Sequence, residues 1–352
     1  MSLRRPSRPA LAAWPIQWRT LGGFAVVGLA FLAIPPLVHV PGRLVAACAK
    51  WIAIAAALEL LSVVGYVLVF ALVFCAGMSK RQSLAAALRG LAASTVLPAG
   101  GLVGPALGVR TARTGDRPIG VIRATVAFTM LTTAPSLIVL GALGLTLWLG
   151  WPSGPHCAPR TLPAAGLAAA LVAGGWRLGG SLPTRHGRDD HPRSAHRHLA
   201  DALMAVREGA RASRHMVATG NWKLVGAIGY YACDNAVLWT AFRAFGHAPA
   251  LSVIVMGYLV GSLGSALPVP AGIGPAEGGL IGALVLYGAP AGPAAGAVLL
   301  YRGISLSLPL TLGAIAWAIG PVPRLRAAHG PQSGGASPVC APDAGRQRAS
   351  VV

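Results

Sequence analysis

Acidic residues are scarce in this sequence. Only nine of its 352 residues are Asp or Glu, against 29 Lys and Arg, and charged residues together make up 11%. A typical soluble domain contains about 25% charged residues. With 55% hydrophobic residues and a mean hydropathy of +0.64, the chain is expected to be a polytopic membrane protein without a cytosolic globular core.

Cysteine patterns and enzyme motifs are also lacking. The five cysteines are scattered without a CxxC pair, so they indicate neither a disulfide framework nor a zinc site. The sequence has no GxxxxGK[ST] loop, no paired-carboxylate loop and no Ser/His/Asp set placed by spacing. We therefore predict no catalytic residue, no metal and no cofactor, and exclude ATP-driven pumping by this chain alone. The formal net charge is +20, but the basic residues lie between apolar runs and not on one face of a folded domain. Nucleic acid is therefore not an expected partner.

Six apolar runs are long enough to cross a bilayer as helices. The predicted fold is therefore all-α, a polytopic integral membrane protein with six spanning helices in a membrane domain over 20–320. A basic N-terminus over 1–19 and a tail over 321–352, rich in Gly, Ser, Pro and Ala and expected to be disordered, flank this domain. The predicted spans are 20–40, 51–77, 119–149, 162–180, 221–245 and 293–320.

Two further apolar stretches, over 91–109 and 251–287, contain helix breakers and are predicted to be broken or re-entrant hairpins. Proline lacks an N–H and glycine lacks a Cβ, so an uninterrupted helix is penalised there. Broken backbone at membrane depth survives only where protein or a watery cavity covers it. With half-helices counted separately, the chain has about eight spans. The breakers taken as candidate substrate-binding residues are Pro98, Gly104, Pro268, Pro270, Gly272 and Gly274.

The two broken stretches resemble each other. Aligned without gaps at an offset of 170, the segments 97–109 and 267–279 share six identities in thirteen positions, including two prolines at the same spacing. This predicts an internal repeat. Because three spans separate the copies, they would enter the membrane from opposite sides, as in the inverted repeats of transporters, and a site is expected near the midplane where the two tips meet.

Basic residues predict the orientation. If both termini, the 78–118 region and the 181–223 loop face the cytoplasm, the inside holds 22 Lys and Arg and the outside three. This is a strong positive-inside signal. Together with an Arg-, Ala- and Gly-rich composition, it predicts a multi-pass protein of the bacterial plasma membrane with both termini cytoplasmic.

Four charged residues lie well inside apolar runs: Glu59, Asp234, Glu277 and Arg302. Each costs about 2.5–3.5 kcal/mol on insertion scales, so each needs a partner or a function. Arg302 could hold the phosphate of a lipid headgroup while a carboxylate holds its amine, or an Arg302–Glu277 pair could only fix the last helix against the broken hairpin. Glu59 is either a proton or cation site or a group bonded to a neighbouring helix. We expect Asp234 to line a cavity.

The cytoplasmic loop over 181–220 is basic. Within it, Leu199, Leu203, Val206 and Ala210 recur at helical spacing, which predicts an amphipathic helix on the membrane surface whose arginines meet anionic headgroups.

The segment Pro268-Val-Pro270-Ala-Gly272-Ile-Gly274-Pro-Ala-Glu277, followed by Tyr301-Arg302, resembles the PxPGGxGxxE…R signature of the flippase-like membrane domain of lysylphosphatidylglycerol synthases and their stand-alone relatives. The resemblance extends over about 20–320 and includes Leu97-Pro98-Ala-Gly-Gly; it departs at Ala271, where the family usually has Gly. It implies a lipid-translocating or lipid-handling protein. The synthases have a soluble aminoacyl-transfer domain after the membrane part; here we expect only a short tail, and no lysyl transfer.

Three functions remain open. The favoured one is movement of a polar or charged lipid headgroup between leaflets, with a membrane phospholipid or other lipid as the partner. The second is an intramembrane enzyme acting on a lipid or polyprenyl phosphate. The third is a non-transporting scaffold subunit that binds a partner through the 181–220 loop.

Overall fold

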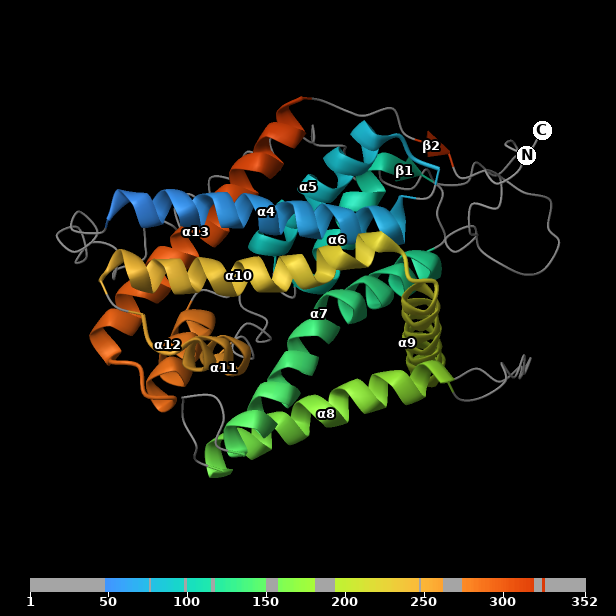
Figure 1. Ribbon diagram of the computed structural model, residues 1–352. Helices are drawn as coiled ribbons and strands as arrows, with labels where there is room; N and C mark the ends of the chain where they lie inside the picture. The colour runs from blue at the N-terminus through green and yellow to red at the C-terminus, as the bar shows by residue number, and fades with distance from the viewer. Residues whose placement is uncertain are drawn as a thin grey trace, which may run out of the picture. The chain divides into compact units, whose positions relative to one another are not determined.

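Apolar runs and the breakers between them determine the helices of this protein. The computed structural model describes residues 48–75, 77–97, 100–114, 118–149, 158–180, 194–246, 248–261, 274–319 and 325–326. Its α-helices are α4 (Ala49–Phe74), α5 (Lys80–Val96), α6 (Gly100–Ala112), α7 (Pro118–Trp148), α8 (Ala158–Gly180), α9 (Ser194–Ala218), α10 (Val225–Ala244), α11 (Leu251–Gly261), α12 (Pro275–Leu286) and α13 (Ala291–Ala318) (Figure 1). A 3-10 turn, η1 (Trp222–Leu224), precedes α10, and the two-residue strands β1 (Arg113–Thr114) and β2 (Leu325–Arg326) pair in parallel.

The predicted all-α polytopic architecture is confirmed. Three of the described helices are long and apolar enough to cross a membrane, at Ala49–Phe74, Gly120–Trp148 and Ala291–Ala318. The predicted spans over 162–180 and 221–245 coincide with α8 and α10, which have 23 and 20 residues. The predicted first span over 20–40, the N-terminus and the tail, apart from 325–326, lie outside the described residues.

Each predicted hairpin consists of two short helices. In the first, Ser79 and the side chain of Gln82 cap the start of α5 reciprocally, and α5 packs on α6 through glycines. A Cβ at Gly108 would lie 2.4 Å from the carbonyl oxygen of Ala86, so the two backbones touch. The second hairpin, α11 and α12, packs as closely, because a Cβ at Gly261 would lie 2.5 Å from the Cα of Leu280.

Helices α4 and α10 form a close antiparallel pair (Figure 1). The N–H of Cys48, before α4, donates to the carbonyl oxygen of Ala244 at the end of α10 (3.2 Å). Further along, Gly65 and Gly226 meet face to face, since a Cβ on either would lie 2.6 Å from the other's carbonyl oxygen. Glycine at these two positions is what allows the helices to approach this closely.

Helix boundaries repeat along the chain at the offset that aligns the two hairpins. Helices α4 and α10 end at Phe74 and Ala244, and α7 and α13 end at Trp148 and Ala318, each pair being 170 positions apart. The series α4–α5–α6–α7 therefore has the same order of helices as α10–α11–α12–α13, although the bounds of the hairpin helices differ by up to five positions at this offset. The equivalent helices α4 and α10 run in opposite directions.

Much of the loop predicted over 181–220 is helix α9, which packs against α7 and α8. Its buried residues include Ala205, Ala210 and Ser213, and Gly209 sits against Val126 of α7. Leu203, predicted on the apolar face, is 53% exposed. The predicted helix is thus present; small residues on one side fit closely against α7, and Leu203, predicted to face the membrane, is on the exposed side.

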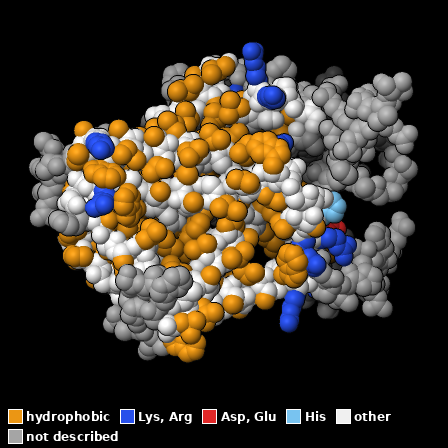
Figure 2. All heavy atoms as spheres, viewed as in Figure 1, with side chains coloured by type: hydrophobic (Ala, Val, Ile, Leu, Met, Phe, Trp, Pro, Cys, Tyr) orange, Lys and Arg blue, Asp and Glu red, His pale blue; other side chains and the backbone are white. Residues whose placement is uncertain are grey.

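Hydrophobic side chains are spread across the described part of the face drawn in Figure 2, with Lys and Arg mainly at its margins and a basic group over the α9 end. Large apolar residues such as Leu61, Ile138, Trp176 and Ile228 are 54–60% exposed. An exposed apolar surface of this extent matches a protein that faces lipid.

Candidate functional site

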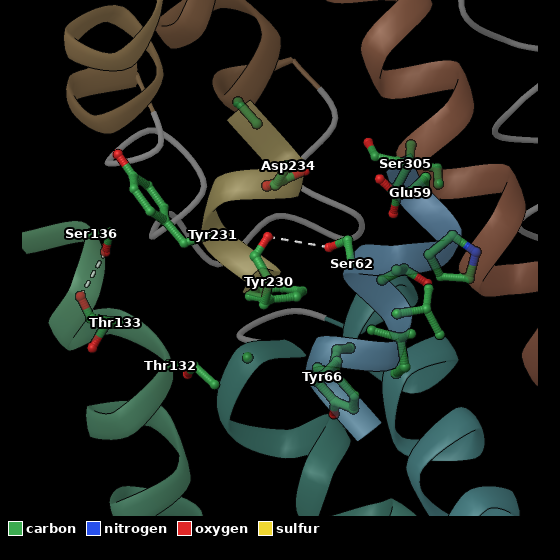
Figure 3. A pocket seen from close by; sticks show the side chains of 18 of the residues that line it. Glu59, Ser62, Tyr66, Thr132, Thr133, Ser136, Tyr230, Tyr231, Asp234 and Ser305 are labelled. Atoms are coloured by element: carbon green, nitrogen blue, oxygen red, sulfur yellow. Dashed lines mark hydrogen bonds between the residues drawn. The ribbon is translucent and has the colours of Figure 1, made fainter. Parts of the chain in front are cut away.

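A cavity of about 500 Å³ lies among the helices (Figure 3). Both hairpins contribute to it, the first through Leu97 and Gly101 and the second through Leu259 and Leu280, together with α4, α7, α10 and α13. Its wall is rich in hydroxyl groups, which come from Ser62, Tyr66, Ser94, Thr95, Thr129, Thr132, Thr133, Ser136, Tyr230, Tyr231, Tyr258, Tyr301 and Ser305. Among the described residues, the charged groups that line it are Glu59, Asp234 and Arg302.

The ion pair between α13 and α12 is formed by Arg302 and Glu277. Arg302 Nε donates to Glu277 Oε1 at 2.7 Å, and the two side chains are 18% and 17% exposed. Glu277 is placed for this contact by the start of α12: Gly274 turns the chain with φ +94°, and its N–H donates to Glu277 Oε2 at 2.6 Å. A non-glycine residue is strained at that φ. The carboxylate therefore both caps α12 and holds the arginine.

Asp234 on α10 accepts a hydrogen bond on each carboxylate oxygen. The Tyr301 hydroxyl donates to Oδ1 at 2.9 Å, and the Tyr258 hydroxyl donates to Oδ2 in a shorter contact. These bonds join α10 to α13 and α11. Asp234 thus lines the cavity, as the sequence analysis expects, with both oxygens satisfied by protein donors.

Glu59 lies on α4 and is 5% exposed. Its Oε2 atom has no hydrogen-bond partner among the described residues. Nearby on the same helix, the Ser62 hydroxyl donates to the carbonyl oxygen of Tyr230 at 3.3 Å, the bond dashed in Figure 3. The structure therefore brings Glu59, Asp234 and Arg302 to one cavity, and Glu277 contacts Arg302 through the ion pair.

The predicted helix breakers are only partly described. Gly104 lies within α6, where a Cβ would meet the Ser94 hydroxyl at 2.0 Å and the carbonyl oxygen of Gly90 at 2.6 Å, so its role is close packing inside the first hairpin. Gly274 is the N-cap of α12. Pro98, Pro268, Pro270 and Gly272 lie outside the described residues.

The motifs in the sequence do not point to most of the hydroxyl groups that line the cavity. On α7, Thr129, Thr132, Thr133 and Ser136 recur at helical spacing, a polar stripe in an apolar run that could have signalled a cavity. Tyr258 and Tyr301 gave no such signal, because nothing local connects them to Asp234.

Arg89, which the sequence places only in the basic 78–118 region, has a structural role as well. It is 4% exposed on α5 and donates from Nε and Nη2 to the carbonyl oxygen of Ala316 on α13 (3.2 and 2.8 Å). It joins the first hairpin to the last helix.

Within the described part of the chain, no group of three or more His, Cys, Asp or Glu side chains could hold a metal ion. The described lining of the cavity consists of hydroxyls that can form hydrogen bonds, one arginine and two carboxyl groups.

Comparison with known proteins identifies the family of the membrane region. A search of curated proteins found no match. The family model described as "Lysylphosphatidylglycerol synthase TM region" matches residues 20–313, from the first predicted span into the last helix. This chain belongs to the family of the lysylphosphatidylglycerol synthase transmembrane region.

Proposed function

We propose that this protein moves a lipid with a polar or charged headgroup between the two leaflets of the bacterial plasma membrane. The observation that supports this most directly is the cavity of about 500 Å³, lined by hydroxyls and by Arg302, among helices apolar enough to cross a bilayer. Ligand pockets are typically about 300–1,000 Å³. The cavity therefore suits a headgroup, with the acyl chains remaining in the surrounding lipid.

Charge in the cavity suggests how a headgroup would be held. We assign the Arg302 guanidinium, oriented by Glu277, to the phosphate, since arginine suits bidentate phosphate binding. The carboxyl groups of Glu59 and Asp234 lie in the same cavity and would face the cationic part of the headgroup. A role in transport rather than catalysis is part of this proposal.

The repeated helix series supports an alternating-access mechanism. Helices α4 and α10 occupy equivalent places in the two series and pack antiparallel, which is what two copies of opposite orientation require. Both hairpins contribute to the cavity wall. A small rotation of one series against the other would then open the cavity first to one side and next to the other. We further propose that the basic segments face the cytoplasm.

A headgroup-accessibility assay in proteoliposomes tests this function. The native chain, an Arg302→Ala variant and an Arg243→Ala control are compared across a panel of anionic and aminoacylated lipids. Arg243 is a suitable control because its guanidinium lies over the rings of Trp51 and Trp239 and is not among the residues that line the cavity. We expect flipping to fall only in Arg302→Ala; equal rates for all three proteins would refute the assignment.

A second candidate is an intramembrane enzyme acting on a lipid or polyprenyl phosphate. The observation that favours it is that Glu59 and Asp234 line the same cavity as Arg302, whereas the sequence offers one carboxylate beside the helix break. Phosphate release from a lipid pyrophosphate by the purified chain, lost in an Asp234→Asn variant, would favour this candidate over transport.

A further inference from the structure

Glu59 differs from the other charged groups around the cavity. Its side chain is 5% exposed, it lines the cavity, and its Oε2 atom has no hydrogen-bond partner in the described part of the chain. Figure 3 shows it on the α4 side of the drawn cavity, in the same part of the view as Ser305 and across from the α7 hydroxyls. A buried carboxyl oxygen without a donor is rare in folded proteins and calls for an explanation.

The neighbouring charges are all compensated by partners of their own. Asp234 accepts a hydrogen bond from a tyrosine hydroxyl on each oxygen. Arg302 is held by Glu277 at 2.7 Å. Glu59 therefore is the carboxyl group of the cavity wall to which the described residues offer the least stabilisation as an anion.

The elements packed against α4 do not supply another cation to the cavity. These elements are α5, α7, α10, α13 and the turn η1. Lys223 of η1 is not among the residues that line the cavity, where Arg302 is the one basic side chain of the described residues. The other titratable groups on or beside this wall are neutral or acidic at neutral pH: Tyr66 on α4, Tyr230, Tyr231, Cys233 and Asp234 on α10, Tyr258 on α11, and Tyr301 on α13.

An isolated carboxylate in a medium of low dielectric is so costly that such a group takes up a proton instead. With two carboxyl groups in one cavity, the proton belongs on the one that lacks hydrogen-bond donors. Asp234 has two such donors and Glu59 Oε2 has none, so the proton belongs on Glu59.

We propose that Glu59 is a proton-carrying site: its carboxyl group is protonated while the cavity holds no cationic ligand, and it releases the proton when the ammonium group of a headgroup moves in beside it. In this step the carboxyl O–H bond breaks, the proton passes to water, and the carboxylate left behind is neutralised by the ammonium group. One proton is exchanged for one cationic headgroup. The part of this proposal that concerns lipid rests on the proposed function; the protonation of Glu59 does not.

The first experiment needs no ligand. Infrared spectra of the purified full chain in detergent at neutral pH report the carbonyl stretch of protonated carboxyl groups. We expect this band in the native chain, in Asp234→Asn and in the control Glu208→Gln, whose carboxylate is 36% exposed and paired with Arg123. The band should be absent in Glu59→Gln. A native spectrum without the band, or a Glu59→Gln spectrum that retains it, overturns the proposal.

Folding of the variant can be checked independently. Glutamine has nearly the same shape as protonated glutamic acid, so Glu59→Gln should unfold at or above the native midpoint. If this variant does not fold, the spectrum of the native chain still tests the protonation of a carboxyl group. Its band must be present at neutral pH and disappear on alkaline titration while helix content is retained. A band that does not titrate would overturn the assignment to a carboxyl group.

The second experiment measures the exchange. Protons released into weak buffer are recorded when the detergent-solubilised protein is mixed with short-chain phosphatidylethanolamine, which has an ammonium group, or with phosphatidylglycerol, which has none. We expect close to one proton per bound phosphatidylethanolamine for the native chain, and none for phosphatidylglycerol or for Glu59→Gln. Equal release by native and variant protein would overturn the exchange. If the infrared band is present but the protein flips no lipid, the proposed function is refuted and the proton site stands. If the protein flips lipid but the band is absent, the proton site is refuted and the proposed function stands.

Discussion

The Glu277 carboxylate has two roles, pairing with Arg302 and capping helix α12, and point variants can separate them. Glu277 holds Arg302 at 2.7 Å and accepts the N–H of Gly274 at 2.6 Å. Glu277→Gln retains an oxygen for the cap and removes the ion pair, whereas Glu277→Ala removes both. Arg302→Met removes the guanidinium and leaves the cap.

The magnitudes follow from burial. Removing one partner of a buried pair costs about 3–5 kcal/mol, and a lone charge at membrane depth costs about 2.5–3.5 kcal/mol. Because the side chains are still 17–18% exposed, we place Glu277→Gln and Arg302→Met at about 2–3 kcal/mol each, at or below the low end of those ranges. Glu277→Ala should cost about 1 kcal/mol more, the usual value of a lost cap.

The double variant Glu277→Gln/Arg302→Met leaves neither charge unpaired. Its free energy of unfolding should therefore exceed the value expected from adding the single effects, by about 1–3 kcal/mol. Unfolding of the purified full chain by SDS, followed by circular dichroism, measures all four variants. Additive single effects would show that the pair contributes no coupling, and equal values for Glu277→Gln and Glu277→Ala would show that the cap contributes nothing. If the double variant still flips lipid at the native rate, the pair only locks the helices.

Three further predictions use the same unfolding measurement. Gly65→Ala should destabilise the protein by about 1–3 kcal/mol, because its Cβ would lie 2.6 Å from a backbone oxygen of α10, whereas Gly229→Ala has open space and should stay near native stability. Gly274→Ala should cost about 1–2 kcal/mol, because its φ is +94°, against a neutral or slightly stabilising effect for Gly278→Ala in the same helix. Arg89→Lys should cost about 1–2 kcal/mol, because one ammonium cannot reproduce two guanidinium bonds to a single carbonyl oxygen of α13. The first explanation would be contradicted if Gly229→Ala lost as much stability as Gly65→Ala, and the second if Gly278→Ala lost as much as Gly274→Ala. A native unfolding midpoint for Arg89→Lys would contradict the third.

Local pattern predicted the helices of this protein well. The apolar runs over 51–77, 119–149 and 293–320 became α4, α7 and α13, because their length and composition leave a spanning helix as the stable structure. Proline and glycine likewise placed both hairpins. The pattern also predicted the helix that forms α9, but not its close contact with α7, which depends on small residues such as Gly209.

The two segments aligned at the offset of 170 also differ in their charged residues. At the offset of 170, Arg302 corresponds to Thr132 and Glu277 to Leu107. Arg302 and Thr132 both line the cavity. The ion pair therefore has no equivalent at the aligned positions, where a hydroxyl stands in place of the guanidinium.

The sequence by itself determined which segments are helical, where they break, and which four charged residues need compensation at membrane depth, since length, hydropathy and backbone chemistry are local properties. The tertiary structure alone decided which partner each charge has. Asp234 is bonded to tyrosines 24 and 67 positions away, and Glu59, although equally conspicuous in the sequence, has one oxygen without a donor among the described residues. These outcomes depend on how α4, α10, α11 and α13 pack, and packing is set by close glycine contacts and side-chain shape summed over the whole fold.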